Sequence, residues 1–338
     1  AVLNQDVVWG TLWTGELKVR RSLGRHGLTL GAEFQDNLQA DQVNYNLAPF
    51  RLFVNSHPGR FTNWSLYAED EFKLTRRLSA NLGVRQDRYP NFGSTTNPRI
   101  GLIYRPLPGA NLKFLYGSAF RAPTPFETYY YSPGYAANTS LRPETMKTYE
   151  VVVENTLGKH VRLTTDFFHN QLRNLIVDFT EANGDVVFRN SEASNATGIE
   201  FEVSAALTRG MEMRASYSYA RASDERTHLS LTNSPRHLGK FNFHVPISRD
   251  KLFAGVGAQY TSERWTLAGH TTSGFPLVNL TLMARNLNSH LDLSASLYNA
   301  FNRTFYDPAL PGYPLDRIRQ DGRSFGFKLT WHSRSEKP

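Results

Sequence analysis

Apolar residues fall on every second position through most of the chain. In residues 195–220, NATGIEFEVSAALTRGMEMRASYSYA, Phe201 and Val203 flank the polar Glu202, and the same alternation resumes after a break at 208–210. A period of two indicates a β-strand with one apolar and one polar face, and the short break indicates a hairpin. Both strands are longer than the 5–6 residues or so that are usual in globular proteins.

The same pattern predicts about fifteen strands along the chain. They lie at about 12–23, 27–37, 62–74, 78–88, 97–105, 111–120, 144–157, 160–172, 194–208, 210–223, 235–247, 250–262, 275–287, 289–300 and 321–331. Asp70 interrupts the apolar face of its strand. No stretch has a sustained helical period and no linker divides the chain. We therefore predict one all-β domain over residues 1–331 and a polar tail at 332–338.

The connections between these strands alternate between short turns and long polar loops. The long loops fill 38–61, 89–96, 121–143, 173–193, 224–234, 263–274 and 301–320. This alternation is typical of an antiparallel, up-and-down transmembrane β-barrel, in which short turns face one side of the membrane and long loops the other. The alternative, a soluble β-sandwich, usually has shorter strands and Greek-key connections.

Composition narrows the possible functions. The chain has no cysteine, and its formal charge of +8 is spread along the sequence, so we expect no disulfide and no nucleic-acid partner. It has no recognisable hydrolase, zinc-protease or nucleotide-binding motif. The strongest candidates for catalysis are Asp224, His228 and His237, which fall in one loop region. Their spacing alone does not indicate a catalytic site, and we expect neither an enzyme nor a bound cofactor or metal.

Several segments resemble the C-terminal part of TonB-dependent outer-membrane receptors. They are SLYAEDEFKLTRRLSANLGVRQDRY (65–89), YGSAFRAPTPFE (116–127), LRPETMKTYEVVVEN (141–155), LTTDFFHNQLRNLI (163–176), NATGIEFE (195–202) and LYNAFNRTFYDPALPGYPLDRIRQDGRSFGFKLTW (297–331). The resemblance implies a barrel of about 22 strands with an N-terminal plug inside it. It also implies uptake of a scarce ligand, usually a ferric siderophore and sometimes cobalamin, haem or a sugar, with energy from the TonB complex.

The resemblance implies an outer-membrane protein that contacts lipid and lipopolysaccharide and meets TonB through its plug. With about fifteen strands and no plug-like segment, we expect this chain to be the later part of such a barrel. If residues 1–9 formed a further strand, a closed barrel of about sixteen strands would be the alternative. That barrel would suit a passive porin or channel, or a structural or adhesive protein. Trp331 ends the last strand, and the role of the tail after it is open.

The loop 121–143, RAPTPFETYYYSPGYAANTSLRP, has the densest pairing of tyrosine with arginine. Exposed aromatic rings beside arginine suit a bulky anionic ligand such as a ferric siderophore, through stacking and cation–π contacts. We predict that the ligand contacts are Arg121, Tyr129, Tyr130, Tyr131, Tyr135 and Arg142. The alternative is that Arg121 and the loop prolines only shape the exit of the chain from the strand.

Basic residues in two neighbouring loops predict a positively charged mouth that attracts anionic ligands. They are Arg51, His57, Arg60, Arg226 and Arg236.

Overall fold

The computed structural model describes residues 3–48, 52–57, 59–248, 251–288 and 290–333, and most of them lie in long β-strands. The long strands are β1 (Leu3–Leu23), β2 (His26–Ala48), β4 (Phe61–Lys73), β5 (Leu78–Tyr89), β6 (Gly93–Tyr104), β7 (Ala110–Arg121), β9 (Glu144–Leu157), β10 (Val161–Thr180), β11 (Val186–Ala206), β12 (Glu212–Asp224), β13 (His237–Ser248), β14 (Leu252–Thr261), β17 (Phe275–Leu287), β18 (Leu291–Tyr298) and β21 (Ser324–Trp331). Each of the strands predicted from the alternation has a counterpart here.

Shorter elements lie in the connections. They are β3 (Leu52–His57), α1 (Pro125–Tyr129), β8 (Tyr135–Ala136), the 3-10 turn η1 (Thr208–Gly210), β15 (Arg264–Trp265), β16 (Thr271–Thr272), β19 (Tyr306–Pro308) and β20 (Arg317–Arg319). No helix within the described ranges is long and apolar enough to cross a bilayer.

The chain forms two compact units. The first unit comprises residues 1–104, 113–150 and 170–195, and the second comprises 105–112, 151–169 and 196–338. Strands β7, β9, β10 and β11 each contribute residues to both units.

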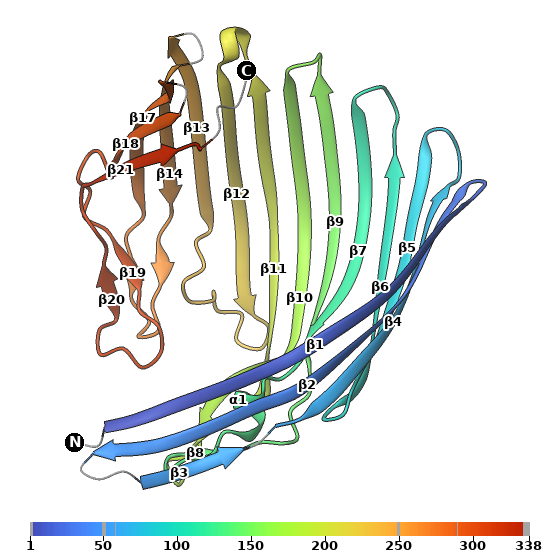
Figure 1. Ribbon diagram of the computed structural model, residues 1–338, viewed down its shortest axis with the longest axis vertical. Helices are drawn as coiled ribbons and strands as arrows, with labels where there is room; N and C mark the ends of the chain where they lie inside the picture. Colours follow the sequence, from blue (N-terminus) through green and yellow to red (C-terminus); the bar gives the residue numbers. More distant parts are fainter. Residues whose placement is uncertain (1–2, 49–51, 58, 249–250, 289, 334–338) are drawn as a thin grey trace. The chain divides into compact units, whose positions relative to one another are not determined.

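Strands of the first unit pair in the order in which they occur in the sequence. β1 pairs antiparallel with β2 from Leu3↔Ala48 to Leu23↔His26. β2 then pairs with β4, β4 with β5, and β5 with β6, all antiparallel. Short connections at opposite ends join β4 to β5 and β5 to β6, while the connection from β2 to β4 contains β3 (Figure 1). The short strand β3 pairs with the far end of β2.

The second unit repeats this arrangement. β12 pairs with β13, β13 with β14, β14 with β17, β17 with β18, and β18 with β21, all antiparallel. The up-and-down order that the alternating connections predicted is therefore confirmed in each unit.

The distribution of apolar side chains is the reverse of that in a soluble core. Six hydrophobic residues are buried among those the structure describes, against fourteen polar or charged ones. Large apolar side chains instead lie exposed along one face of the strands, as Leu66 and Trp64 do on β4, while Ser65 between them is only 2% exposed. Because soluble proteins bury apolar residues, this inversion supports a sheet whose outer face contacts lipid.

The acidic residue that interrupts the apolar face of β4 has a partner on the adjacent strand. An oxygen of Asp70 lies 2.7 Å from Nδ1 of His26, and the imidazole stacks on Phe72 with ring centroids 4.3 Å apart. The carboxylate therefore lies beside a hydrogen-bonding group rather than isolated among apolar side chains.

Three of the expected long loops are largely strand instead. In 89–96, β5 runs to Tyr89 and β6 begins at Gly93, so only residues 90–92 connect the two strands. β2 continues to Ala48 and is followed by β3, so most of 38–61 is paired, and residues 173–193 form the ends of β10 and β11. The segment before residue 12 extends β1 and does not form a separate strand. Side-chain amides explain the continued pairing near the end of β2, where Asn44 donates to Asn4 and Asp6.

Adjacent residues of β17 test which face meets lipid. Leu280 lies on the exposed apolar face, and Thr281 lies on the opposite face next to Ser296. We expect Leu280→Arg to destabilise the folded, membrane-inserted protein by about 2–4 kcal/mol, because the guanidinium would enter hydrocarbon. Thr281→Arg at the same depth should change stability little. Equal losses in urea unfolding from lipid vesicles would show that the assignment of faces is wrong.

Candidate ligand-binding site

An arginine at the end of β7 joins the two ends of the loop that follows. Arg121 donates from Nε and Nη2 to Glu144 at 2.6 and 2.8 Å, and from Nη1 and Nη2 to Glu127, both at 2.9 Å. Glu144 is the first residue of β9, and its Oε1 also accepts from the backbone N–H of Ile176, 2.8 Å away. Two-pronged arginine–carboxylate pairs are among the strongest hydrogen-bonded contacts in proteins, so this Arg121 clamp fixes where the loop leaves and re-enters the sheet.

The helix α1 begins the loop, and its sequence explains its position. Thr124 is the N-cap, Pro125 follows at the first helical position, and Glu127 completes a capping box with Thr124. Burial raises the pKa of the Glu127 carboxyl, but hydrogen bonds from Arg121 and Thr124 outweigh it, so the net shift is downward. Glu127 therefore serves the helix cap and the Arg121 clamp together.

Tyr130 is fixed by contacts on both its ring and its hydroxyl. Its ring lies 4.5 Å from that of Phe126 and 5.4 Å from that of Tyr135, centroid to centroid. Its hydroxyl oxygen lies 3.3 Å from both Asn44 Nδ2 and Asp6 Oδ1. Burial raises the pKa of Tyr130. This tyrosine therefore connects the loop to the β1–β2 hairpin.

The rest of the loop docks on the hairpin formed by β10 and β11. β8 pairs in parallel with the start of β11, and Asn138 donates to the carbonyl of Phe188 at 2.8 Å. The Asn190 side chain accepts from the Arg142 N–H and donates to the Arg142 carbonyl. The loop is thus held along its length by hydrogen bonds.

The structure brings some of the predicted contact residues together and gives others a different environment. Tyr130 and Tyr135 are neighbours, and Tyr131 beside them is 59% exposed. Arg142 is exposed, but Arg121 is bonded to two carboxylates of the chain. Tyr129 lies at the end of α1 and is half-buried. The exposed part of the loop therefore combines tyrosine rings with one cation.

Sequence reasoning missed the residues that hold this surface in place. They are Asp6, Asn44, Glu127, Glu144, Phe188 and Asn190. The capping-box spacing of Thr124 and Glu127 was the only local signal, because the other partners are distant in sequence.

Two of the basic residues that were predicted to form a positive mouth have partners within their own unit. Arg60 lies 3.6 Å from Asp36, and Arg236 donates to Ser230. Arg51 and the side chain of His57 lie outside what the structure describes.

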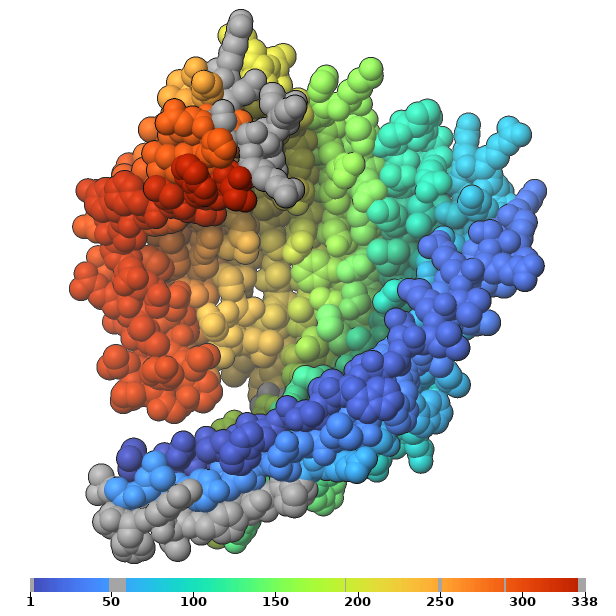
Figure 2. Space-filling model, in the orientation of Figure 1, coloured from blue at the N-terminus to red at the C-terminus, as the bar shows by residue number. Residues whose placement is uncertain are grey.

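The loops of the second unit form a separate, tightly bonded cluster. Arg264 is 8% exposed and donates to Asn233, to the carbonyl of Tyr306 and to Asp307. The Asp316 carboxylate accepts a hydrogen bond from the Thr266 hydroxyl, and this bond is the main reason that the pKa of Asp316 is lowered. Figure 2 shows residues 301–320, coloured red, as a compact group of atoms. Two of the predicted long polar loops, 263–274 and 301–320, thus contain the small hairpins β15–β16 and β19–β20.

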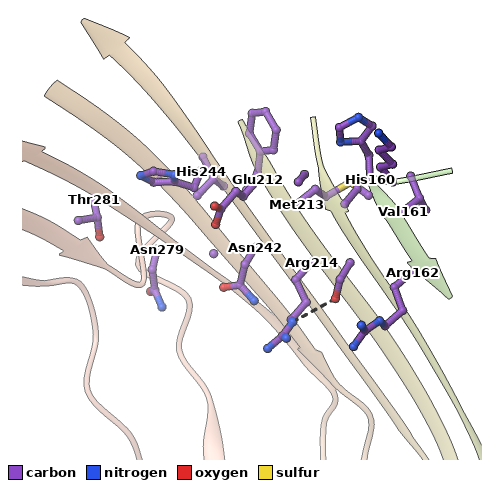
Figure 3. Close-up of a pocket in the computed structure, with 18 of the residues that line it drawn as sticks. His160, Val161, Arg162, Glu212, Met213, Arg214, Asn242, His244, Asn279 and Thr281 are labelled. Carbon is purple, nitrogen blue, oxygen red and sulfur yellow. Dashed lines mark hydrogen bonds between the residues drawn. The ribbon is translucent and has the colours of Figure 1, made fainter. Parts of the chain in front are cut away.

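A pocket of about 950 Å³ that is lined by both polar and apolar side chains lies within the second unit (Figure 3). Its wall includes Arg162, Arg214, Asn242 and Asn279, and Arg214 donates to Ser204 over 3.4 Å. These residues come from the polar positions of several strands, which agrees with a water-facing side opposite the apolar one.

The catalytic candidates do not form a catalytic arrangement. The Asp224 carboxylate accepts from the N–H and hydroxyl of Thr227, which closes a local turn. His237 lies instead 2.7 Å from the hydroxyl of Tyr217. Across the part of the chain that the structure describes, no group of three or more histidines and carboxylates could hold a metal ion.

Weakening the Arg121 clamp should loosen the loop without unfolding the sheet. Arg121→Lys keeps the charge but cannot reproduce four hydrogen bonds in a fixed plane. Since the side chain is 43% exposed, we expect a loss of about 1 kcal/mol, and roughly fivefold faster chymotrypsin cleavage within 122–143. Arg142→Lys is the matched control, because its loop contacts are made by the backbone. Identical cleavage rates for both variants and the unsubstituted protein would contradict a clamping role.

The lowered pKa of Glu127 predicts how the loop responds to acid. A lowered folded-state pKa gives stability that is present above the unfolded value of 4.5 and is lost as pH falls through the folded value. Hydrogen exchange of loop amides, corrected for intrinsic rates, should thus be constant from about pH 7 to 5 and rise only in stronger acid. The step should be smaller in Glu127→Gln but not absent, because hydrogen bonds from Arg121 also lower the pKa of Glu144, which still titrates in this variant. A step above the unfolded pKa would contradict the assignment.

Comparison with known proteins agrees with this architecture. Residues 3–300 match the family model described as "TonB dependent receptor-like, beta-barrel". The probable TonB-dependent receptor BfrD of Bordetella pertussis is 24% identical over 295 residues, covering 75% of this chain and 39% of the relative. The iron-regulated outer membrane virulence protein of Vibrio cholerae is 22% identical over 310 residues, covering 83% and 46%. The chain thus spans less than half of each relative.

A solved structure shows the same fold. The ferric enterobactin receptor mutant Q482A (PfeA) of Pseudomonas aeruginosa, in complex with enterobactin, superposes with a TM-score of 0.78 at 19% identity. The match covers 96% of this chain and 54% of that one. With the family model matched over most of its length, the chain belongs to the TonB-dependent receptor β-barrel family.

Proposed function

We propose that this chain is the ligand-capturing barrel portion of a receptor that takes up a ferric siderophore across the outer membrane with energy from TonB. The family is one of outer-membrane proteins, and its members are receptors and transporters rather than enzymes. The observation that carries the ligand class is the surface of the loop 121–143, which we call the tyrosine loop. No catalytic residue is needed for this role, and we assign none.

The tyrosine loop presents aromatic rings on a fixed frame. Tyr131 is 59% exposed and Tyr135 is 38% exposed, beside Phe126 at 42%. Ferric siderophores are bulky, anionic and often aromatic, so rings for stacking and a nearby cation, Arg142, suit them. Because Tyr130 and the Arg121 clamp already hold the loop, binding would lose little conformational entropy.

Arg121 contributes to capture by positioning the loop. All of the Arg121 contacts described above go to carboxylates of the chain, so its charge is already compensated. We therefore assign direct contact to Tyr131, Tyr135 and Arg142, with Tyr129 at the margin, and support to Arg121 and Tyr130.

Transport requires parts beyond the barrel wall. We propose that a plug domain of the receptor meets the TonB complex and that the apolar strand faces contact membrane lipid and lipopolysaccharide. The family membership and the inverted burial support both statements.

Uptake measurements in a strain that lacks the receptor test the proposal. Cells complemented with the full-length receptor should grow on a ferric siderophore as sole iron source and accumulate the radioiron-labelled complex. Accumulation should stop when TonB is deleted or the proton gradient is collapsed. Uptake that survives TonB deletion would indicate a passive channel. Failure to accumulate any ferric siderophore, with cobalamin, haem or a sugar accumulated instead, would contradict the ligand class.

Removing the exposed rings should weaken ligand binding and leave folding intact. We expect Tyr131→Ala combined with Tyr135→Ala to raise the Kd at least tenfold, about 1.4 kcal/mol. Tyr313→Ala is a control, because Tyr313 is also 59% exposed but lies in a different loop. The heat-shift of the barrel on gels should be the same for all variants. An unchanged Kd in the double variant would show that the tyrosine loop does not contact the ligand.

A further inference from the structure

The face of the β1–β2 hairpin that the tyrosine loop contacts is lined with amide and carboxylate side chains. They are Asn4 and Asp6 of β1 and Asn44 and Asn46 of β2, and we call these four residues the amide surface. The two residues on each strand are two positions apart, so all four side chains share one face. Asn4 lies opposite Asn46, and Asp6 lies opposite Asn44. The amide surface and the tyrosine loop belong to the same compact unit.

Asn44 organises the amide surface and connects it to the tyrosine loop. It is only 3% exposed, and its Nδ2 lies 2.6 Å from Asp6 Oδ1 and 2.9 Å from Asn4 Oδ1. The same nitrogen lies 3.3 Å from the hydroxyl oxygen of Tyr130. Asn4 in turn donates to Oδ1 of Asn44 at 2.9 Å and to Oδ1 of Asn46 at 2.8 Å. Because each side chain is held by another, the surface is ordered before a ligand binds, which lowers the entropic cost of binding.

Two polar groups of the amide surface have no hydrogen-bond partner among the residues that the structure describes. Asp6 accepts from Asn44 and Tyr130 through Oδ1, which leaves Oδ2 as an unbonded acceptor. Asn46 accepts from Asn4 through Oδ1, which leaves the N–H groups on Nδ2 as unbonded donors. Asp6 is exposed and Asn46 is half-buried, so a ligand can reach both residues.

The positions of this acceptor and this donor match the repeat of an extended peptide. Asp6 and Asn46 are diagonal neighbours on the two strands, and side chains in such positions are about 7 Å apart. An extended peptide also repeats every two residues over about 7 Å, with its N–H and carbonyl groups on the same side again. A peptide-like arm can therefore donate to Asp6 and accept from Asn46 at once. A compact anionic chelate cannot use this surface, because the Asp6 carboxylate would repel it.

We propose that the amide surface binds a peptide-like arm of the ligand, while the tyrosine loop binds the aromatic, anionic, iron-chelating part of the same molecule. Tyr130 joins the two surfaces, since its ring packs against Tyr135 and its hydroxyl oxygen lies 3.3 Å from Asp6 Oδ1. A peptide arm is favoured over a sugar arm because its donors and acceptors recur at the spacing of the strands themselves. This inference rests on the proposed function and narrows its ligand class to ferric chelates that carry peptide N–H groups.

Synthetic ferric chelates that share one set of iron-binding groups test the arm directly. The probes are a ferric tricatecholate without an arm, the same chelate with a short glycine–serine arm, and the armed chelate methylated on each peptide nitrogen. The Kd of the full-length receptor, measured by fluorescence quenching in detergent, should be at least about fivefold lower for the armed chelate than for the armless one. Methylation should remove this gain, because Asp6 would lose its donor.

The outcomes separate this inference from the proposed function. Equal Kd values for the armed and armless chelates would overturn the inference and leave ferric chelates as the ligand class. The same gain from a glucosyl arm in place of the peptide arm would also overturn it. Failure to bind any of these chelates would contradict the proposed function, and the inference with it.

An isosteric substitution locates the gain at the amide surface. Asp6→Asn keeps Oδ1 for Asn44 and Tyr130 but replaces the unbonded acceptor with an N–H donor. The armed chelate should then lose most of its gain, while the Kd for the armless chelate stays the same or falls, because a negative charge has been removed. Asp178→Asn is the matched control, since it removes the same charge from an exposed carboxylate on β10 in the same unit, and it should keep the gain. The heat-shift on gels should be the same for both variants and the unsubstituted receptor. A gain that survives in Asp6→Asn, or is lost equally in Asp178→Asn, would overturn the proposal.

Discussion

Backbone hydrogen bonding without water is the constraint on which this structure depends. In hydrocarbon each N–H and carbonyl must find a partner within the protein, and a sheet of long antiparallel strands supplies these partners to every strand that has a neighbour on both sides. With lipid on one side, one face of each strand is apolar and the other polar. Neighbouring residues such as the exposed Leu66 and the buried Ser65 show this pattern. A lipid environment on one face also explains why buried polar residues outnumber buried apolar ones in the described chain.

Beyond the hydrocarbon the constraint is lifted, and the two ends of the strands then differ in construction. At the long-loop end, hydrogen bonds within the protein replace the bilayer as the source of order. They are those of the Arg121 clamp, of the Thr124 capping box and between the Asn190 side chain and the Arg142 backbone. Their bonds are made within the protein, so the exposed tyrosines stand on a fixed frame. At the short-turn end the chain is ordered by tight local turns instead, such as the one in which the Thr75 hydroxyl oxygen accepts from the backbone N–H groups of Arg77 and Leu78.

The alternation of apolar and polar residues was sufficient to predict every long strand, because lipid on one side imposes it. It failed where the strands leave the bilayer. The end of β2, up to Ala48, pairs with the first residues of β1, and asparagine side chains such as Asn44 add hydrogen bonds there. This part of the two strands has no apolar face from which it could be predicted. The tyrosine loop was found from composition, but the role of Arg121 depends on Glu127 and Glu144, which lie 6 and 23 residues away. No local pattern connects three charges at such spacings.

The two-faced sheet is tested most directly by spin labels placed singly at successive residues of β11, from Ile199 to Ala205, in the reconstituted receptor. Accessibility to oxygen, which dissolves in lipid, should be high at Phe201 and Val203 and low at Glu200 and Glu202. Accessibility to a water-soluble nickel chelate should be higher at Glu200 and Glu202 than at Phe201 and Val203. A period of two with opposite phases for the two quenchers is the predicted result. Equal accessibility along the strand, or the reverse phase, would contradict a strand that crosses the membrane with its apolar face in lipid.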